Sequence, residues 1–270
     1  MNLAAVRAVA LAVFKESVRD RVPYSLVLFA VVLMAAAFLM SRLTAAQDLK
    51  VTKDLGLATM NVIGLLIALF IGTGLVAKEV ERRSIYAVLA KPLSRTTFLL
   101  GKFAGLVLTL AVNLALMTAA FYAMLLYQEL TTIEWVRQGW RAPALDLRLL
   151  VPIGLTLVQL TLVTAVALLF STFSSPLLAV LLTLGVWVAG QFSGDLRSFE
   201  TAVDAPVAAA ITRAVYYVLP NLSALDVKNQ VVHGLAIAWP AVGAALAATG
   251  VYVALVLTVA VAVFSRRDFK

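Results

Sequence analysis

The sequence predicts an all-α polytopic membrane protein with six transmembrane helices. Hydrophobic residues make up 63% of its 270 positions and charged residues only 13%, with a mean hydropathy of +0.99. A typical soluble domain is about half apolar and about a quarter charged. The apolar residues gather in long runs, and about 20 such residues cross a bilayer core of about 30 Å. No segment between the runs is long enough for a soluble domain, so residues 1–270 are expected to form one transmembrane domain.

The six spans are predicted at residues 22–42, 57–76, 98–127, 149–170, 177–192 and 236–264. Before them, residues 3–20 are predicted to form a helix lying on the membrane surface. Residues such as Val13 share an apolar face of this helix and charges such as Asp20 lie opposite. A frayed polar tail is the alternative interpretation. Ser94 has a side chain suited to capping the N-terminus of the helix that forms the third span.

The fifth predicted span is too short to cross the membrane unaided. Its 16 residues, 177–192, reach only about 24 Å as a helix. Residues 206–219 carry apolar side chains at helical spacing, with Tyr216 and Tyr217 suited to the membrane interface. We expect this segment to be a re-entrant or surface-lying helix on the extracytoplasmic side, between the fifth and sixth spans.

The distribution of positive charge predicts the orientation. Six spans place both termini on one side of the membrane. If that side is cytoplasmic, it holds 13 of the 22 Lys and Arg residues: four before the first span, six around the segment between the second and third, and three at the C-terminus. An excess of Lys and Arg marks cytoplasmic loops, so both termini are expected in the cytoplasm. The net charge of +8 is therefore interpreted as membrane topology, and no nucleic-acid binding is expected.

No catalytic or cofactor site is predicted in this chain. The absence of cysteine excludes disulfides, thiolate metal sites and cysteine nucleophiles, and a single histidine, His233, excludes paired-histidine metal sites. The pair Gly101-Lys102 has Thr96 where a phosphate-binding loop requires its first glycine. The chain is therefore expected to bind neither a metal nor ATP.

Three uncharged polar residues, Asn61, Asn113 and Gln159, lie within predicted spans. Polar groups inside a membrane need partners and often mark a substrate path. Hydrogen bonds between helices are the alternative role. No Asp, Glu, Lys or Arg lies in the middle of these spans, apart from Lys102 near the end of one of them. This argues against an ion-coupled carrier and indicates that the energy comes from elsewhere.

The polar segment after the second span is predicted to be a helix, residues 78–91, that docks on a partner. Its charges come first and its apolar and aromatic residues later, before Pro92 ends the helix. Such a helix can insert an apolar anchor into a groove with its charges at the rim. Lying among the lipid headgroups is the alternative. The contact residues are expected to be Lys78, Glu79, Glu81, Arg82, Arg83, Tyr86, Leu89 and Lys91.

The run from Glu79 to Arg95, followed by Leu99-Leu100-Gly101-Lys102, resembles the signature of ABC-2 type transport permeases. Arg83-Ser84 stands where a Gly-Thr pair is common in that family. The resemblance extends over the whole chain, from the surface helix to the Arg-Arg-Asp ending. It is closest to the small permeases with a separate ATPase polypeptide, the NosY-like branch.

The resemblance implies that residues 78–91 are the cytoplasmic coupling helix, seated in a cleft of an ABC ATPase. It also implies two ATPase copies, a second permease copy that forms a homodimer with the first, and ATP and Mg bound by the ATPase. The location implied is the bacterial cytoplasmic membrane, in contact with its lipid.

Three functions follow from these inferences. The first is the permease of an ABC exporter for an amphipathic, peptide-like or lipid-linked cargo. The second is a mechanotransmission subunit that transports nothing and passes ATPase-driven motion to an extracytoplasmic partner through residues 193–235. The third is an ATP-independent channel or scaffold.

Overall fold

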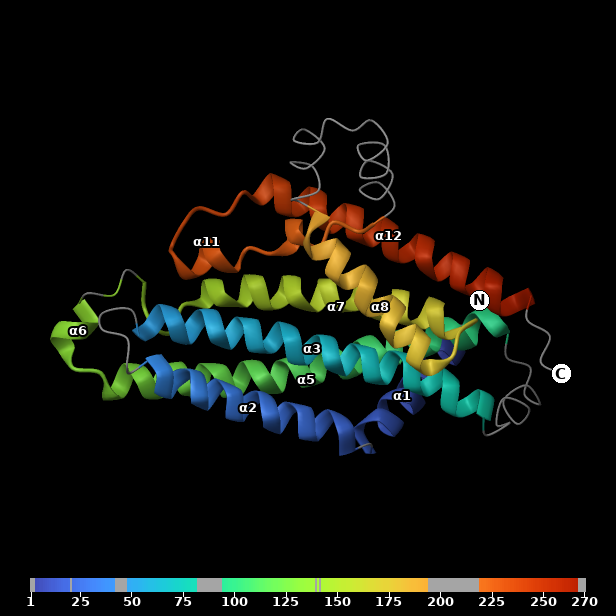
Figure 1. Cartoon of the computed structure of the whole chain (residues 1–270), viewed down its shortest axis with the longest axis horizontal. Coiled ribbons are helices and arrows are strands. Elements are labelled where there is room, and N and C mark those ends of the chain that lie inside the picture. Colours follow the sequence, from blue (N-terminus) through green and yellow to red (C-terminus); the bar gives the residue numbers. More distant parts are fainter. Residues whose placement is uncertain are drawn as a thin grey trace.

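The computed structural model describes seven parts of the chain: residues 3–19, 21–41, 48–81, 94–138, 140, 142–193 and 219–266. These residues form helices, turns and loops, and no strand occurs among them. The long helices are α1 (Leu3–Arg19), α2 (Arg21–Ser41), α3 (Asp48–Glu81), α5 (Arg95–Thr131), α7 (Leu150–Ser171), α8 (Pro176–Gln191) and α12 (Trp239–Arg266). The short ones are α6 (Glu134–Gln138), η1 (Leu147–Leu149), η2 (Ser223–Leu225) and α11 (Lys228–Val232). The protein is an all-α polytopic membrane protein, as its composition predicts (Figure 1).

Four stretches of the described helices are long and apolar enough to cross a membrane: Leu49–Thr73, Arg95–Thr131, Leu147–Ser171 and Trp239–Arg266. Two shorter apolar stretches, Tyr24–Ala36 and Pro176–Gln191, lie within or overlap the predicted first and fifth spans. Each of the six predicted spans therefore overlaps one apolar helix.

Helix α3 differs most from the expected boundaries. It begins at Asp48, nine residues before the expected start of the second span, and continues through 34 residues to Glu81. At a rise of about 1.5 Å per residue it is about 51 Å long. Its first two turns are polar and resemble a loop in composition. Thr52 and Lys53 are nevertheless buried, so tertiary contacts stabilise the helical conformation of this segment.

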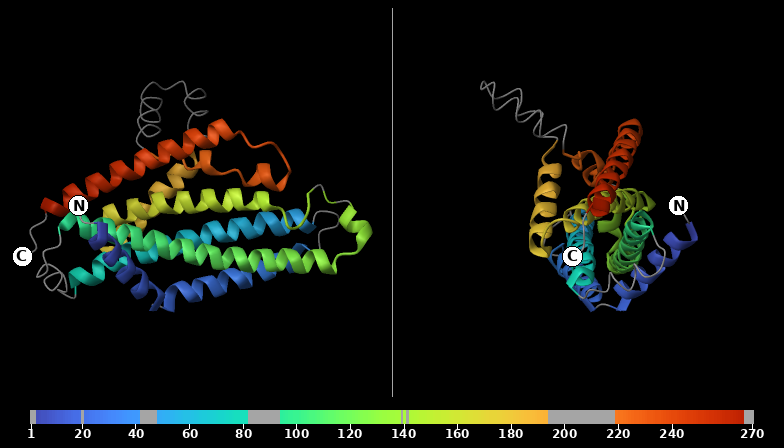
Figure 2. Two further views of the ribbon diagram at one scale, coloured as in Figure 1. Left: turned by 180° about the vertical axis from the view of Figure 1, so that it is seen from behind. Right: turned by 90° about the vertical axis from the view of Figure 1, so that its right-hand side faces the viewer.

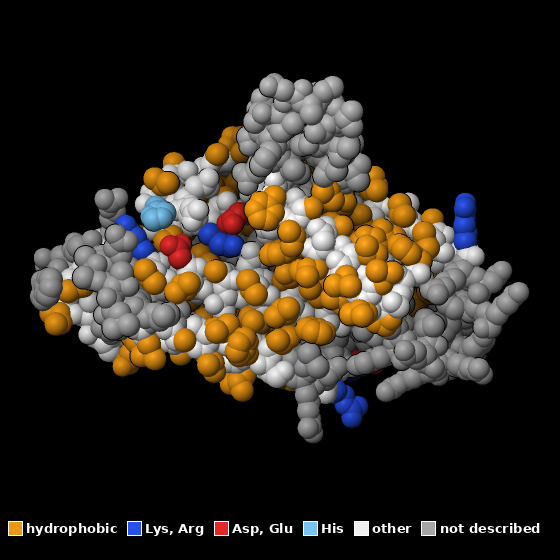
Figure 3. All heavy atoms as spheres, viewed as in Figure 1, with side chains coloured by type: hydrophobic (Ala, Val, Ile, Leu, Met, Phe, Trp, Pro, Cys, Tyr) orange, Lys and Arg blue, Asp and Glu red, His pale blue; other side chains and the backbone are white. Residues whose placement is uncertain are grey.

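Helices α3 and α7 occupy the interior of the bundle. In α7, 67% of the most apolar stretch is buried inside the bundle, and in α3 the share is 61%. In α12 it is only 17%. Helix α3 contacts α2, α5, α7 and α8, while α7 contacts α3, α5, α8 and α12. Two views show α12 on the outside of the bundle (Figures 1 and 2). Apolar side chains cover the middle of one broad face, and charged side chains gather near α11 (Figure 3).

One end of the bundle brings together the first and last described helices. Helix α1 packs against the start of α5, where Gly105 permits close contact: a Cβ there would lie 2.7 Å from the Ala10 carbonyl oxygen. On the predicted apolar face of α1, Val13 and Ser17 are buried, whereas Leu3 is exposed. We call this region the termini end, and the opposite end, which carries α6, the α6 end (Figure 2).

The predicted re-entrant segment lies outside the described residues except for Leu219. Beyond it, the chain is fixed to the bundle by the Leu222 amide, which donates to the Gly190 carbonyl oxygen at 3.1 Å. Gly190 permits this approach, because an added Cβ would lie 2.9 Å from the Pro220 carbonyl oxygen. The chain then continues through α11, which contacts α3.

Candidate coupling and translocation site

The structure describes the chain immediately before and after most of the predicted docking helix, residues 78–91. Lys78, Glu79 and Glu81 lie in the last turns of α3, so the backbone of the second span continues into the predicted helix without a break. The other predicted contact residues, Arg82, Arg83, Tyr86, Leu89 and Lys91, lie outside the described residues. The chain returns at Ser94 and enters α5 at once.

Ser94 caps α5, as its sequence position predicts. Its Oγ accepts a hydrogen bond from the Thr97 backbone amide at 3.2 Å, and the two hydroxyl oxygens lie 2.7 Å apart. The backbone of Ser94 is extended, with φ −66° and ψ 143°. A capping side chain of this kind satisfies an amide that the first turn leaves unpaired. The start of α5 is therefore defined immediately after the docking segment.

Arg95 joins the start of α5 to the end of α12. Its Nη1 donates to the Ser265 carbonyl oxygen at 2.7 Å and approaches the Phe264 carbonyl oxygen at 3.4 Å. The last carbonyls of a helix lack helical partners and carry partial negative charge, which favours a cation there. Phe98 stacks on Phe264 one turn further along, with ring centroids 6.2 Å apart.

This contact was not predicted from the sequence, although the position of Arg95 gives an indication of it. A cation in the first turn of a helix is disfavoured by the dipole of that helix, so the position of Arg95 indicates an interaction with another element. Lys102, also near the start of α5, is 1% exposed, and its Nζ lies 4.8 Å from the Phe98 ring centroid. This distance is within the range of a cation–π interaction.

The three predicted intramembrane polar residues lie at similar depth on α3, α5 and α7. Contacts of two glycines set the register: Gly56 faces Phe121 across the antiparallel α3–α5 pair, and Gly64 faces Leu160 across the parallel α3–α7 pair. From these contacts the three side chains lie within about one helical turn of the same level. All three are buried: Asn61, Asn113 and Gln159.

The three side chains differ in their hydrogen bonds. Asn113 Nδ2 donates to the Thr109 carbonyl oxygen of its own helix at 2.8 Å. Among the described residues, no partner occurs for the buried atoms Asn61 Oδ1 and Gln159 Nε2, nor for the indole Nε1 of Trp187 on α8. Buried polar atoms are almost always paired, and leaving one unpaired costs about 1–3 kcal/mol.

Trp187 lies on α8, which follows the tight turn around Thr172–Ser175 and contacts both α3 and α7. Its side chain packs against the core cluster that contains Leu160 and against the adjoining cluster that contains Leu162. Within the described part of the chain, one acceptor and two donors therefore lack partners on α3, α7 and α8. We call Asn61, Gln159 and Trp187 the polar layer. Sequence reasoning did not include Trp187, whose buried indole is a signal only once α8 is placed.

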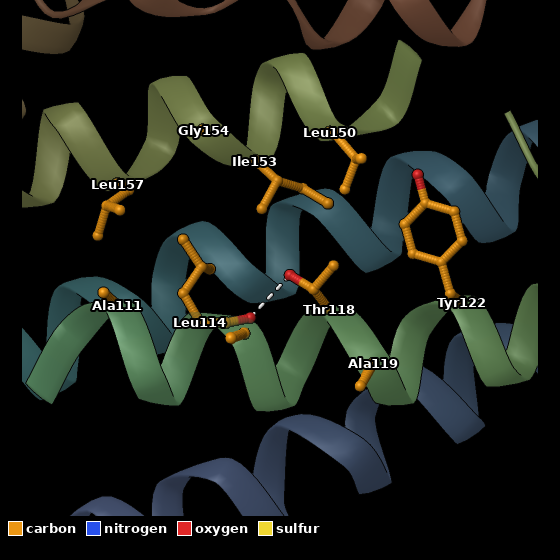
Figure 4. A pocket seen from close by; sticks show the side chains of 10 residues that line it. Ala111, Leu114, Thr118, Ala119, Tyr122, Leu150, Ile153, Gly154 and Leu157 are labelled. Carbon is orange, nitrogen blue, oxygen red and sulfur yellow. Dashed lines mark hydrogen bonds between the residues drawn. The ribbon is translucent and has the colours of Figure 1, made fainter. Parts of the chain in front are cut away.

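An apolar groove of about 450 Å³ lies between α5 and α7. Figure 4 shows its side chains projecting between the two helices, with α3 behind them. Both hydroxyl groups of the groove donate to backbone carbonyl oxygens. Thr118 Oγ1 donates to the Leu114 carbonyl oxygen at 2.7 Å, and Tyr122 Oη donates to the Asp146 carbonyl oxygen at 2.9 Å. The lining residues are Ala111, Leu114, Ala115, Thr118, Ala119, Tyr122, Leu150, Ile153, Gly154 and Leu157.

Comparison with known families decides the class of protein. The family described as ABC-2 family transporter protein matches residues 7–269, nearly the whole chain. The chain belongs to the ABC-2 transporter family. No curated protein matches it significantly. This ABC-2 permease is therefore the transmembrane component of an ABC transporter, and its family implies an ABC ATPase as partner. The resemblance read from residues 79–102 is confirmed at the level of the family; the NosY-like branch stays a prediction.

Proposed function

We propose that this ABC-2 permease uses the movement of a separate ABC ATPase to export an amphipathic or lipid-linked cargo. Residues 78–91 are the coupling helix in this proposal, and two permeases act with two ATPases that bind ATP and Mg. The permease itself has no catalytic site. The observation that carries the proposal is the bond between Arg95 and Ser265, because it ties the element that follows the coupling helix to the last span.

Movement would enter the bundle on both sides of the coupling helix. On one side, α3 continues from residue 81 back through the interior of the bundle. On the other, Ser94 and Arg95 connect the start of α5 to α12. A displacement of the coupling helix therefore acts on an interior helix and on the outer helix α12 together.

The middle of the spans suits a neutral polar group of a cargo. No Asp, Glu, Lys or Arg occurs at residues 57–73, 103–127, 150–171, 176–191 or 239–264. The polar layer offers an acceptor on Asn61 and donors on Gln159 and Trp187. Hydroxyl and amide groups can satisfy both kinds of atom, so we place the translocation path beside this layer on α3, α7 and α8. Asn113, assigned to the path from sequence, is satisfied within its own helix.

The same geometry supports cytoplasmic termini. Helix α1, the start of α5 and the end of α12 pack together through Val13, Leu99 and Phe264. The flanks of the coupling helix, Glu81 and Ser94, belong to helices that end and begin at this termini end. With the ATPase on the cytoplasmic side of a bacterial cytoplasmic membrane, both termini lie there too, and the α6 end faces outward.

A second function, transmission of motion to an extracytoplasmic partner, is supported by the anchoring of the outer segment. Ser193 Oγ donates to Asn221 Oδ1 at 2.9 Å, and the Leu222 amide donates to the Gly190 carbonyl oxygen. Movements of α8 would therefore reach the surface formed by η2 and α11.

The coupling assignment is tested by the double variant Tyr86→Ala, Leu89→Ala. Loss of the apolar anchor should release the ATPase during purification while the permease stays in the membrane. Copurification of undiminished ATPase would contradict the assignment. Cargo accumulation in vesicles that contain the complex separates the two functions: ATP-dependent accumulation supports export, whereas ATP-dependent binding of an outer partner without accumulation supports transmission.

A further inference from the structure

The groove between α5 and α7 is a hollow in the apolar surface of the bundle. Ala111, Ala115 and Ala119 lie on α5, one turn apart, and line the groove with small side chains. On α7, the exposed Gly154 leaves a gap between Leu150 and Leu157. A Cβ added at Gly154 would meet nothing within 4 Å, so the gap is open and not filled by a neighbouring side chain.

The length of the groove matches one leaflet of a bilayer. Ala111 and Tyr122 mark its extent along α5 and are 11 positions apart, which is about 16 Å at about 1.5 Å per residue. Half of a bilayer core is about 15 Å thick. Its volume of about 450 Å³ also falls in the range of about 300–1,000 Å³ found for ligand sites.

The end of the groove near η1 has the chemistry of a headgroup region. Tyr122 lies there with its hydroxyl bonded to the Asp146 carbonyl oxygen, and tyrosine favours the membrane interface. The exposed Arg148 follows two residues later, before the groove residue Leu150. The Asp146 carboxylate accepts from the Arg148 backbone amide at 2.9 Å. An exposed guanidinium at this level suits a phosphate group.

We propose that this groove binds one acyl chain of a membrane phospholipid, with the headgroup beside Arg148. The site is independent of what the permease transports and of how the ATPase docks. The chain lies along Ala111, Ala115 and Ala119, and its end reaches the middle of the bundle.

A transmembrane helix of a second copy is the competing occupant, since small residues at a spacing of four favour helix contacts. However, a spanning helix is about 30 Å long and 10–12 Å wide. It would have to continue past the Tyr122 ring, which lies at one end of the groove (Figure 4). A flexible chain that ends within one leaflet meets no such obstacle.

The test uses the full-length permease in vesicles of phosphatidylethanolamine and phosphatidylglycerol. A small fraction of phosphatidylcholine carries a photoreactive diazirine at the end of one acyl chain. After illumination, mass spectrometry locates the labelled residues. We expect residues 111–122 and 150–157 to be labelled several-fold more than Leu177 and Leu181 of α8, which are exposed and do not line the groove.

Gly154→Leu fills the gap and should lower labelling of the groove several-fold. Gly185→Leu on α8 is the matched control, because Gly185 is also exposed with nothing within 4 Å of an added Cβ and does not line the groove. Equal labelling of the groove and α8, or labelling that Gly154→Leu leaves unchanged, would overturn the proposal.

A third arm tests the competing occupant. The protein has no cysteine, so Ala115→Cys introduces a unique thiol in the wall of the groove. We expect this variant to stay uncrosslinked when the vesicles are oxidised. Efficient disulfide formation between two copies would mean that a second permease covers the groove, and the acyl-chain proposal would be wrong.

Discussion

Arg95 and Ser265 are 170 positions apart in the sequence, yet Arg95 Nη1 donates a 2.7 Å hydrogen bond to the Ser265 carbonyl oxygen. The bond joins the first turn of α5 to the last turn of α12 at the termini end. Together with the stacked rings of Phe98 and Phe264, it joins these two helix ends close in sequence to the predicted coupling helix.

Arg95→Ala is expected to loosen the end of α12. Hydrogen bonds from charged groups contribute about 1.5–3 kcal/mol to stability. Because Arg95 is half-exposed, solvent screening should reduce the contribution of its bond to the lower end of this range or below it. Amide exchange at residues 262–266 should become faster, and cargo moved per ATP hydrolysed should fall. Arg137→Ala, which removes an exposed arginine of α6 at the opposite end of the bundle, is the control. Unchanged exchange in α12 would show that the bond is not structural.

Gly105→Val is expected to separate α1 from α5. The added Cβ would lie 2.7 Å from both the Ala10 carbonyl oxygen and Val13 Cβ, and a backbone atom cannot rotate away. Such overpacking costs about 1–3 kcal/mol, which thermal unfolding in detergent would detect. Gly250→Val is the control: it makes the same change in helix propensity, but a Cβ added at Gly250 would have no neighbouring atom within 4 Å. Equal melting temperatures of the two variants would refute the close contact.

Gln159→Met separates a structural from a transport role of the polar layer. The substitution conserves side-chain length and removes an amide nitrogen that has no partner. Thermal stability should stay the same or rise, while export falls several-fold. Asn113→Leu is the comparison, since Asn113 is satisfied within α5, and it should leave export nearly unchanged. If Gln159→Met exports normally, the polar layer is not on the path.

Lys53→Met is expected to release the loop at the α6 end. Lys53 is 2% exposed, and its Nζ donates to the Pro143 carbonyl oxygen at 2.7 Å. Without this bond, residues 144–149 should exchange their amide hydrogens faster, and the loop should be cleaved sooner by protease. Lys50→Met, at a less buried position on the same helix, should have little effect. A loop that stays equally protected in both variants would count against the role of Lys53.

The approximate positions of the spans could be predicted because each is set by the length of an apolar run. The start of α3 could not. Residues 48–56 are polar, and their helix depends on burial of Thr52 and Lys53 against segments distant in the sequence. A local pattern contains no information about such contacts.

For the candidate site, the sequence indicated which residues are unusual but not how they interact. The polarity of Asn61 and Gln159 marks them as unusual within apolar spans, but which atoms lack partners depends on the neighbouring helices. The sequence also places Arg95 shortly after the predicted coupling helix without indicating that its partner is the backbone of α12. Backbone carbonyls are the same for every residue, so they leave no signal in the sequence.

The burial of α7 predicts which helices of the permease move least. Helix α7 contacts α3, α5, α8 and α12 at once, and close-packed interiors resist sliding. Helix α12 is mostly exposed within one copy of the chain, so we expect it to move more easily than α7. Spin labels that take α7 as the fixed reference should therefore report the ATP-driven stroke as displacements of α12, and little change between α7 and α3.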